Sequence, residues 1–171
     1  MEEEIVNRVA NSKLKTFDLE EIYPTGERIL FDIKDWLFEE LILKEKDFRA
    51  YVKEHDWSQY KDSFVAIHCS VDAIIPTWAY MLVSTELMSY AKKVVIGDLE
   101  ILETIIFQEL INELDLNDFS DRPVIIKGCA DKYIPNSAFG LLISKIQPVA
   151  KSILFGEACS TVPLFKAKGK K

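Results

Sequence analysis

An internal repeat constrains the fold of this chain more than any other feature of its sequence. Residues 62–98 align on residues 121–157 without a gap, at an offset of 59. Such a fixed offset is typical of one supersecondary unit used twice, so the sequence predicts an internal duplication. The identical pairs include a turn proline and a terminal glycine: Asp62/Asp121, Val65/Val124, Ile67/Ile126, Asp72/Asp131, Ile75/Ile134, Pro76/Pro135, Ala79/Ala138, Leu82/Leu141, Ala91/Ala150, Lys92/Lys151 and Gly97/Gly156.

Each copy has the pattern of a strand, a helix and a second strand. Residues 64–67 and 124–126 are short apolar runs without polar alternation, as in strands that are buried on both faces. Helices follow from Thr77 and Asn136, whose side chains can accept a hydrogen bond from an amide of the first helical turn. The second strands are expected at residues 94–96 and 153–155.

Strands that alternate with helices predict an α/β fold with a mostly parallel sheet. A twofold axis between two βαβ units would place their first strands side by side, giving one doubly wound sheet of order 2-1-3-4. The switch point would then lie between the strands at Phe64 and Val124, where ligands bind in such sheets. We expect a single α/β domain, in which residues 1–61 wrap the sheet, 99–120 form a connecting helix and 158–171 form a tail.

Charge and composition argue against several partners. With 28 acidic and 21 basic side chains, the formal net charge of −7 repels phosphate backbones, which argues against nucleic acid. No apolar run approaches the roughly 20 residues of a membrane span, and residues 1–15 lack the pattern of a signal peptide. Three cysteines without close spacing fit a reducing compartment, so we expect a cytoplasmic protein without a membrane partner.

The three cysteines are the candidate metal ligands. Cys69 follows the first strand, Cys129 follows the third, and Cys159 lies just past the fourth. In the predicted order these strands are neighbours about 4.8 Å apart, so the sulfurs would gather at one rim of the sheet. Thiolates bind zinc or iron–sulfur clusters, and His68 or a carboxylate would complete the ligand set. The alternative is that the cysteines are small apolar core residues.

Three carboxylates, Asp72, Asp131 and Glu157, are expected near the same rim. Asp72 and Asp131 are equivalent loop residues of the two copies. As a pair they could bind metal or act as acid and base. Alternatively, they only cap the turns that precede Pro76 and Pro135.

Cys129 is also a candidate nucleophile. It lies in the strand-to-helix turn 128–131, where backbone amides could lower the pKa of a thiol. His68 would act as its base. However, His68 directly precedes Cys69 on a strand, so one of these two side chains should face away from the crevice. Dinucleotide, phosphate-loop, zincin and serine-hydrolase motifs are absent from the sequence, so no motif assigns a reaction.

The run 78–83 is apolar on all sides of its predicted helix. Such a helix is either covered by its own chain or pairs with a second copy. A non-catalytic homodimeric interaction module is therefore a third functional hypothesis, beside the metal-binding and thiol hypotheses.

Short segments throughout the chain resemble one protein family. They are residues 4–10, 31–37, 56–60, 76–80 and 159–164. These segments resemble the DUF2480 family, uncharacterised bacterial proteins found mainly in Bacteroidetes, and the resemblance covers nearly the whole chain. It implies no activity. Encoding near iron–sulfur assembly components implies an accessory role in cluster assembly or metal handling, with those components as partners.

Overall fold

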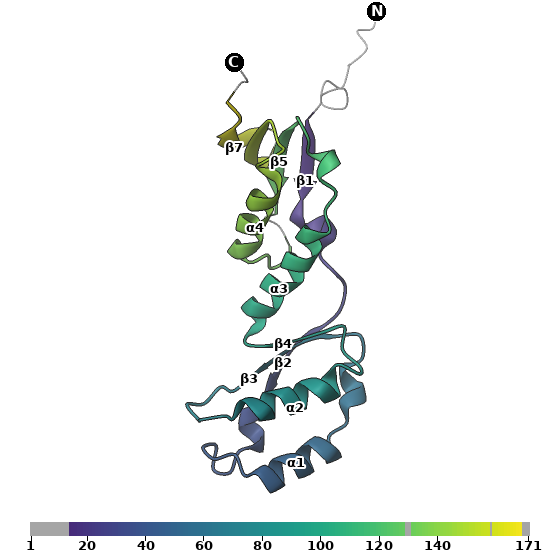
Figure 1. The fold of residues 1–171 in the computed structure, drawn as a ribbon, viewed down its shortest axis with the longest axis vertical. Helices are drawn as coiled ribbons and strands as arrows, with labels where there is room; N and C mark the ends of the chain where they lie inside the picture. The colour runs from purple at the N-terminus through teal and green to yellow at the C-terminus, as the bar shows by residue number, and fades with distance from the viewer. Residues whose placement is uncertain (1–13, 129–130, 158, 169–171) are drawn as a thin grey trace, which may run out of the picture. The chain divides into compact units, whose positions relative to one another are not determined.

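The computed structural model describes residues 14–128, 131–157 and 159–168 (Figure 1). These residues form a mixed α/β protein with four α-helices and two mostly parallel sheets, so the predicted α/β class is confirmed. The chain divides into two compact units. We call Pro24–Ile106 the inserted unit, and the residues up to Tyr23 together with those from Phe107 onward the flanking unit.

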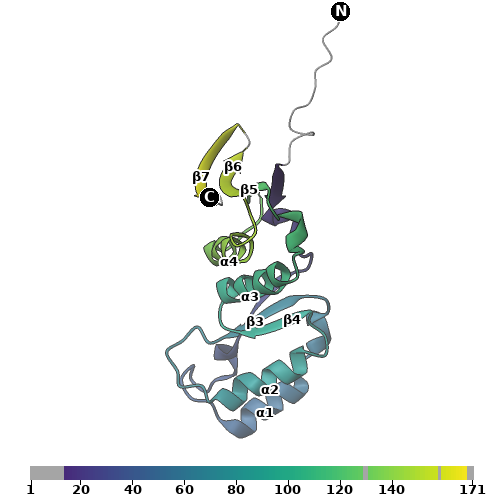
Figure 2. The ribbon, with the colours of Figure 1, turned by 45° about the horizontal axis from the view of Figure 1, so that its top comes forward.

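The inserted unit contains one parallel sheet of order β2-β3-β4. Helix α1 connects β2 to β3, and α2 connects β3 to β4. Because both crossovers advance in the same direction, α1 and α2 lie side by side on one face of the sheet (Figures 1 and 2). The elements are β2 (Arg28–Asp32), the 3₁₀ helix η2 (Ile33–Trp36), α1 (Glu45–Glu54), η3 (Trp57–Tyr60), β3 (Phe64–His68), α2 (Thr77–Leu87) and β4 (Lys93–Ile96).

The flanking unit has a sheet of order β1-β5-β6-β7, in which only β7 is antiparallel to its neighbour. Strand β7 carries Pro163, which faces Leu154 of β6 at an irregularity of the register. Helix α3 begins in the inserted unit and belongs to the flanking unit from Phe107 onward. The elements are β1 (Lys15–Asp18), η1 (Leu19–Ile22), α3 (Leu99–Asn112), η4 (Leu116–Asp118), β5 (Pro123–Lys127), α4 (Asn136–Ile146), β6 (Ser152–Glu157) and β7 (Ser160–Lys166).

Elements of the two units correspond at the sequence offset of 59. Strand β3 and helix α2 have the same bounds as β5 and α4 after this shift. Asp62 and Asp121 both adopt a left-handed backbone, with φ of 60° and 53°. Asp56 and Asp115 both cap a 3₁₀ helix by accepting the backbone N–H two residues later. The aligned sequences therefore adopt the same local structure down to individual caps.

The correspondence includes the first strand of each sheet. β1 and η1 resemble β2 and η2, because a buried phenylalanine and a capping aspartate recur as Phe17-Asp18 and Phe31-Asp32. Both strands pair in parallel with the first strand of an aligned copy, β1 with β5 and β2 with β3. Residues expected in an N-terminal wrapping segment thus supply one strand to each sheet.

The predicted single sheet of order 2-1-3-4 is not formed. It required the strands at Phe64 and Val124 to be neighbours, but β3 lies between β2 and β4, and β5 lies between β1 and β6. The physical reason is that both edges of each strand are already hydrogen-bonded once β1 and β2 are in place. The predicted switch point between β3 and β5 therefore does not exist.

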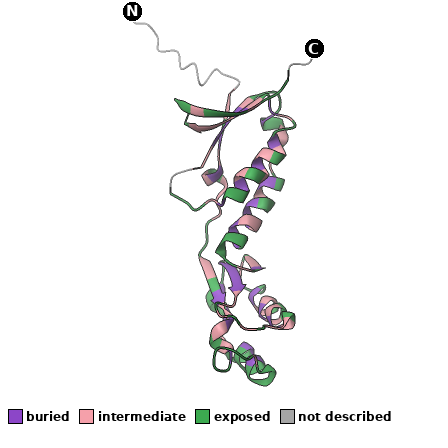
Figure 3. Cartoon of the chain, turned by 90° about the vertical axis from the view of Figure 1, so that its left-hand side faces the viewer, coloured by how far each residue is buried: buried purple, intermediate pink, exposed green. Residues whose placement is uncertain are grey.

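Each unit has its own hydrophobic core, with buried residues along the strands and one side of the helices (Figure 3). Helix α2 buries Ala79, Val83 and Leu87, and the equivalent side of α4 is buried in the same way. The run 78–83 is apolar on all sides and was expected to be covered on every side, but Met81 in its middle is 59% exposed. One face of α2 is thus buried within its own unit, while Met81 lies outside that face.

A buried ion pair joins β2 to α3 within the inserted unit. Arg28 Nε donates to Glu103 Oε1 at 2.7 Å, and the two side chains are 14% and 3% exposed. Arg28 Nη1 also donates to the carbonyl oxygens of Pro24 and Gly26, at 2.8 and 2.7 Å. The guanidinium lies 4.5 Å from the centre of the Phe64 ring. Arg28 therefore holds the start of β2 and the first turns of α3 on one face of the sheet.

We expect the substitution Glu103→Gln to lower the free energy of unfolding by about 3 kcal/mol, because removing one partner leaves a desolvated charge in the core. Urea unfolding followed by circular dichroism measures this change. The exposed Glu54→Gln is the control, and it should stay within about 0.5 kcal/mol of the wild type. Equal stability of the two variants would show that the ion pair contributes little.

Candidate functional site

The residues predicted to form a site fall into both units. Asp131, Glu157 and Cys159 belong to the flanking unit, and His68, Cys69 and Asp72 belong to the inserted unit. Cys129 lies outside the described residues. The predicted shared rim rested on β3 and β5 being neighbours, which they are not. Within residues 14–128, 131–157 and 159–168, no three Cys, His, Asp or Glu side chains are grouped so that they could hold a metal ion.

In the flanking unit, an ion pair links the carboxyl ends of β5 and β6. Lys127 Nζ lies 2.5 Å from Glu157 Oε2, and this hydrogen bond raises the pKa of Lys127. Cys159 is exposed in the turn between β6 and β7. The backbone N–H of Asp131 donates to Glu20 Oε1 at 3.1 Å, and its own side chain is exposed. Glu157 therefore forms an ion pair that links the ends of β5 and β6.

In the inserted unit, Asp32 and His68 end β2 and β3 and are paired in register. Asp32 Oδ1 accepts the backbone N–H groups of Lys34 at 3.0 Å and Ser70 at 3.1 Å. Asp32 Oδ2 lies 3.6 Å from His68 Nε2, and both side chains are 24% exposed. One oxygen of the carboxylate is thus fixed by two amides while the other faces the imidazole ring.

The Asp32 carboxylate is held in its charged form. Burial raises its pKa, but hydrogen bonds from the Ser70 side chain and from the amides of Lys34 and Ser70 outweigh this effect, and His68 adds to them. The net result is a pKa of Asp32 below its usual value. At neutral pH the carboxylate is ionised and can accept a hydrogen bond from a ring N–H group.

Cys69 and Tyr80 lie on the other face of the same strand end. Cys69 packs with the α1 and α2 core, and its Sγ donates to the carbonyl oxygen of Val71 at 3.5 Å. Burial raises the pKa of the Tyr80 phenol, and the nearby Cys69 and Asp32 raise it further. His68 instead faces Asp32, and Cys129, for which His68 was predicted to act as the base, lies outside the described residues.

Sequence reasoning found His68 and Cys69 but missed Asp32 and Tyr80. Asp32 lay at the end of an apolar run that also reads as a strand, and only the parallel register places it beside His68. The repeat offers a further comparison, because the flanking unit carries different residues at the equivalent positions. These are Lys127 for His68, Gly128 for Cys69 and Phe139 for Tyr80.

A second feature of the inserted unit is the aromatic cluster around His55. The His55 ring lies 4.7 Å from Trp57, 5.3 Å from Trp36 and 5.7 Å from Tyr60, measured between ring centroids. Its Nε2 atom is 2.9 Å from the Tyr60 hydroxyl oxygen and 3.2 Å from Gln59 Nε2. The neutral, lone-pair form of Nε2 suits this position, because the Gln59 amide nitrogen is a donor.

The surroundings of His55 oppose its protonation. Burial lowers the pKa of His55, and this effect outweighs the charge of Asp56, which raises it. In the flanking unit the equivalent of His55 is Leu114, and the equivalents of Trp57 and Tyr60 are Leu116 and Phe119. The same structural position therefore accepts an apolar side chain.

Acidification should destabilise the inserted unit through His55. Its folded-state pKa is below the unfolded value of about 6.5, so the unfolded state binds a proton first and the free energy of unfolding falls as pH decreases from there. We expect His55→Leu, which copies Leu114, to reduce this pH dependence. Urea unfolding at pH 7.5 and 5.5 measures it, and an unchanged pH dependence in the variant would contradict the assignment.

The fold and the site define a two-unit α/β protein that carries an imidazole–carboxylate pair at the strand ends of its inserted unit. The family described as "Protein of unknown function (DUF2480)" matches residues 3–167, nearly the whole chain. The protein belongs to the DUF2480 family, and the resemblance found in the sequence is confirmed. No curated protein and no solved structure matches the chain. Among the described residues, every helix is too short or too polar to cross a membrane.

Proposed function

We propose that the inserted unit binds a small polar ligand at the carboxyl ends of β2 and β3, where His68 acts as a general acid or base. The observation that carries this proposal is the geometry of Asp32, with one oxygen held by two amides and the other 3.6 Å from His68 Nε2. A titratable group oriented by a second, fixed group is the usual arrangement of acid–base sites. Because Nε2 faces Asp32, Nδ1 is the nitrogen offered to the ligand.

Comparison of the two units supports the choice of the inserted unit. At the equivalent strand end, the flanking unit has Lys127 paired with Glu157. A lysine in an ion pair does not exchange protons near neutral pH, whereas histidine does. The Asp32–His68 separation exceeds a hydrogen bond, and such contacts often tighten only when the ligand is bound.

The proposal is tested by the nitrogen resonances of the two histidines, His55 and His68, in labelled protein. We expect the neutral His68 ring to carry its proton on Nε2, because this nitrogen faces the charged Asp32 carboxylate 3.6 Å away. Asp32→Asn should shift the ring toward the Nδ1–H form, since an amide nitrogen would face Nε2 while the amide oxygen keeps the backbone contacts. Acetate, acetamide, glycine and glycerol, added separately, probe binding at Nδ1.

Asp18→Asn is the matched control, because Asp18 has the same capping role in the flanking unit but no histidine beside it. It should leave the His68 resonances unchanged. An unchanged tautomer in Asp32→Asn would remove the orienting role of Asp32. The absence of any response of His68 to all four probes at 10 mM would contradict a polar-ligand site.

A role in zinc or iron–sulfur handling stays a prediction that rests on the family resemblance, and homodimer formation through α2 stays a prediction too. A cysteine-based site requires that metal copurify with the protein under anaerobic conditions. It also requires that the metal be lost when Cys69, Cys129 and Cys159 are all replaced by alanine. Elemental analysis measures this directly, and a wild-type protein without zinc or iron would contradict the hypothesis. Thiol catalysis at Cys129 predicts an alkylation pKa well below the free value of about 8.5.

A further inference from the structure

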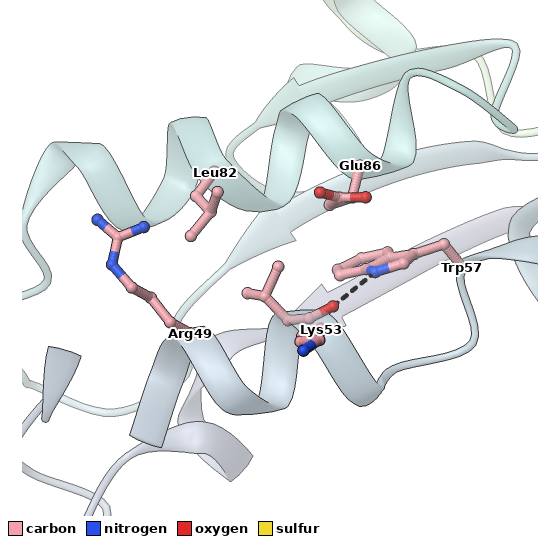
Figure 4. Close-up of a pocket in the computed structure, with 6 residues that line it drawn as sticks. Arg49, Lys53, Trp57, Leu82 and Glu86 are labelled. Atoms are coloured by element: carbon pink, nitrogen blue, oxygen red, sulfur yellow. Dashed lines mark hydrogen bonds between the residues drawn. The ribbon is translucent and has the colours of Figure 1, made fainter. Parts of the chain in front are cut away.

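The inserted unit has a groove between α1 and α2 that the Asp32–His68 site does not use. Its volume is about 300 Å³, at the lower end of the roughly 300–1,000 Å³ typical of small-ligand sites. Residues of α1, α2 and η3 line it (Figure 4). They are Arg49, Val52, Lys53, Trp57, Leu82 and Glu86.

The inner part of the groove is apolar. Trp57 is 7% exposed, and its indole N–H donates to the carbonyl oxygen of Val52 at 2.9 Å. The only polar atom of the indole is therefore satisfied within the protein, and the groove meets the hydrocarbon part of its ring. Leu82, which is half-buried on α2, adds a second apolar contact. This surface suits a hydrocarbon chain.

The rim of the groove carries two cations and one carboxylate. Arg49 and Lys53 lie one turn apart on α1, and Glu86 lies on α2. Arg49 bonds to Glu45 through Nε at 2.9 Å, which leaves the two terminal nitrogens of its guanidinium fork to meet an incoming oxygen pair. Figure 4 shows Arg49 and Glu86 at opposite ends of the groove, so an anion is favoured at the Arg49 end.

In the flanking unit, a side chain bridges the equivalent positions on helices α3 and α4. The equivalents of Lys53 and Glu86 are Asn112 and Lys145, and Lys145 Nζ donates to the carbonyl oxygen of Asn112 at 3.0 Å. In the inserted unit, Lys53 and Glu86 both line the groove instead. The two helices of the inserted unit thus keep a space that the flanking unit spans with a side chain.

We propose that this groove binds an apolar carboxylic acid, with its hydrocarbon chain on Trp57 and Leu82 and its carboxylate at the Arg49 end of the rim, where Lys53, one turn along α1, adds a second positive charge. A short chain fits the volume, so octanoate is a suitable probe. For a ligand of about ten heavy atoms at ordinary ligand efficiency, the expected Kd is of the order of 1 mM. The carboxylate supplies orientation, and the chain supplies the buried apolar area.

The test is a titration of the full-length protein with octanoate, followed by amide and indole resonances. Shifts should concentrate on α1, α2 and the Trp57 indole, which Trp57→Leu identifies among the three tryptophans. The double variant Arg49→Gln/Lys53→Gln should raise the Kd at least fivefold. Lys46→Gln, which removes one charge from α1 outside the groove, should change it less than twofold.

The neutral analogue octanamide and the cation octylammonium complete the experiment. Both should bind at least fivefold more weakly than octanoate if the basic rim selects an anion. Octanamide binding as tightly as octanoate, an unchanged Kd in the double variant, or no shifts at 10 mM octanoate would each overturn the proposal. Because the readout lies on α1 and α2, failure here leaves the His68 proposal untouched.

Discussion

Parallel strand pairing is the constraint on which both sheets depend. Parallel neighbours cannot be joined by a tight turn and need a long crossover, so each sheet must recruit its strands from separated parts of the chain. Here β2 pairs with β3 across α1, and β1 pairs with β5 across the whole inserted unit. The four residues of β1 therefore join a sheet whose other members follow much later in the sequence, at the cost of closing a long loop.

The sequence predicted the local elements well and the long-range pairing poorly. The strands at 64–67 and 124–126 and the helix starts at Thr77 and Asn136 agree with β3, β5, α2 and α4. Strand β1 has the sequence Lys-Thr-Phe-Asp, which is too short and polar to be recognised without its partner. The one signal for this strand in the sequence is the recurrence of Phe17-Asp18-Leu19 as Phe31-Asp32-Ile33. Local patterns indicate where a strand lies, but they do not indicate which distant strand pairs with it.

The candidate site, like the fold, was predicted only in part. His68 followed from the end of a buried strand, whereas its partner Asp32 depended on a register that only strand pairing fixes. The strand order on which the expected cysteine cluster was built is not formed, so that cluster stays a prediction. The repeat does provide an internal comparison, because the equivalent strand ends of the two copies carry His68 in one and Lys127 in the other. Residues that differ between equivalent positions of the two copies are therefore not required by the shared fold, and they are the candidates for a functional site.

Strand β7 has a consequence for how the protein behaves at high concentration. An outer parallel strand presents unpaired amides to any passing chain, and such edges promote aggregation. β7 covers β6 with an antiparallel strand that carries Pro163, which has no amide hydrogen to donate. The hairpin therefore ends the β6 side of this sheet with an edge that is less suited to the addition of a further strand at Pro163.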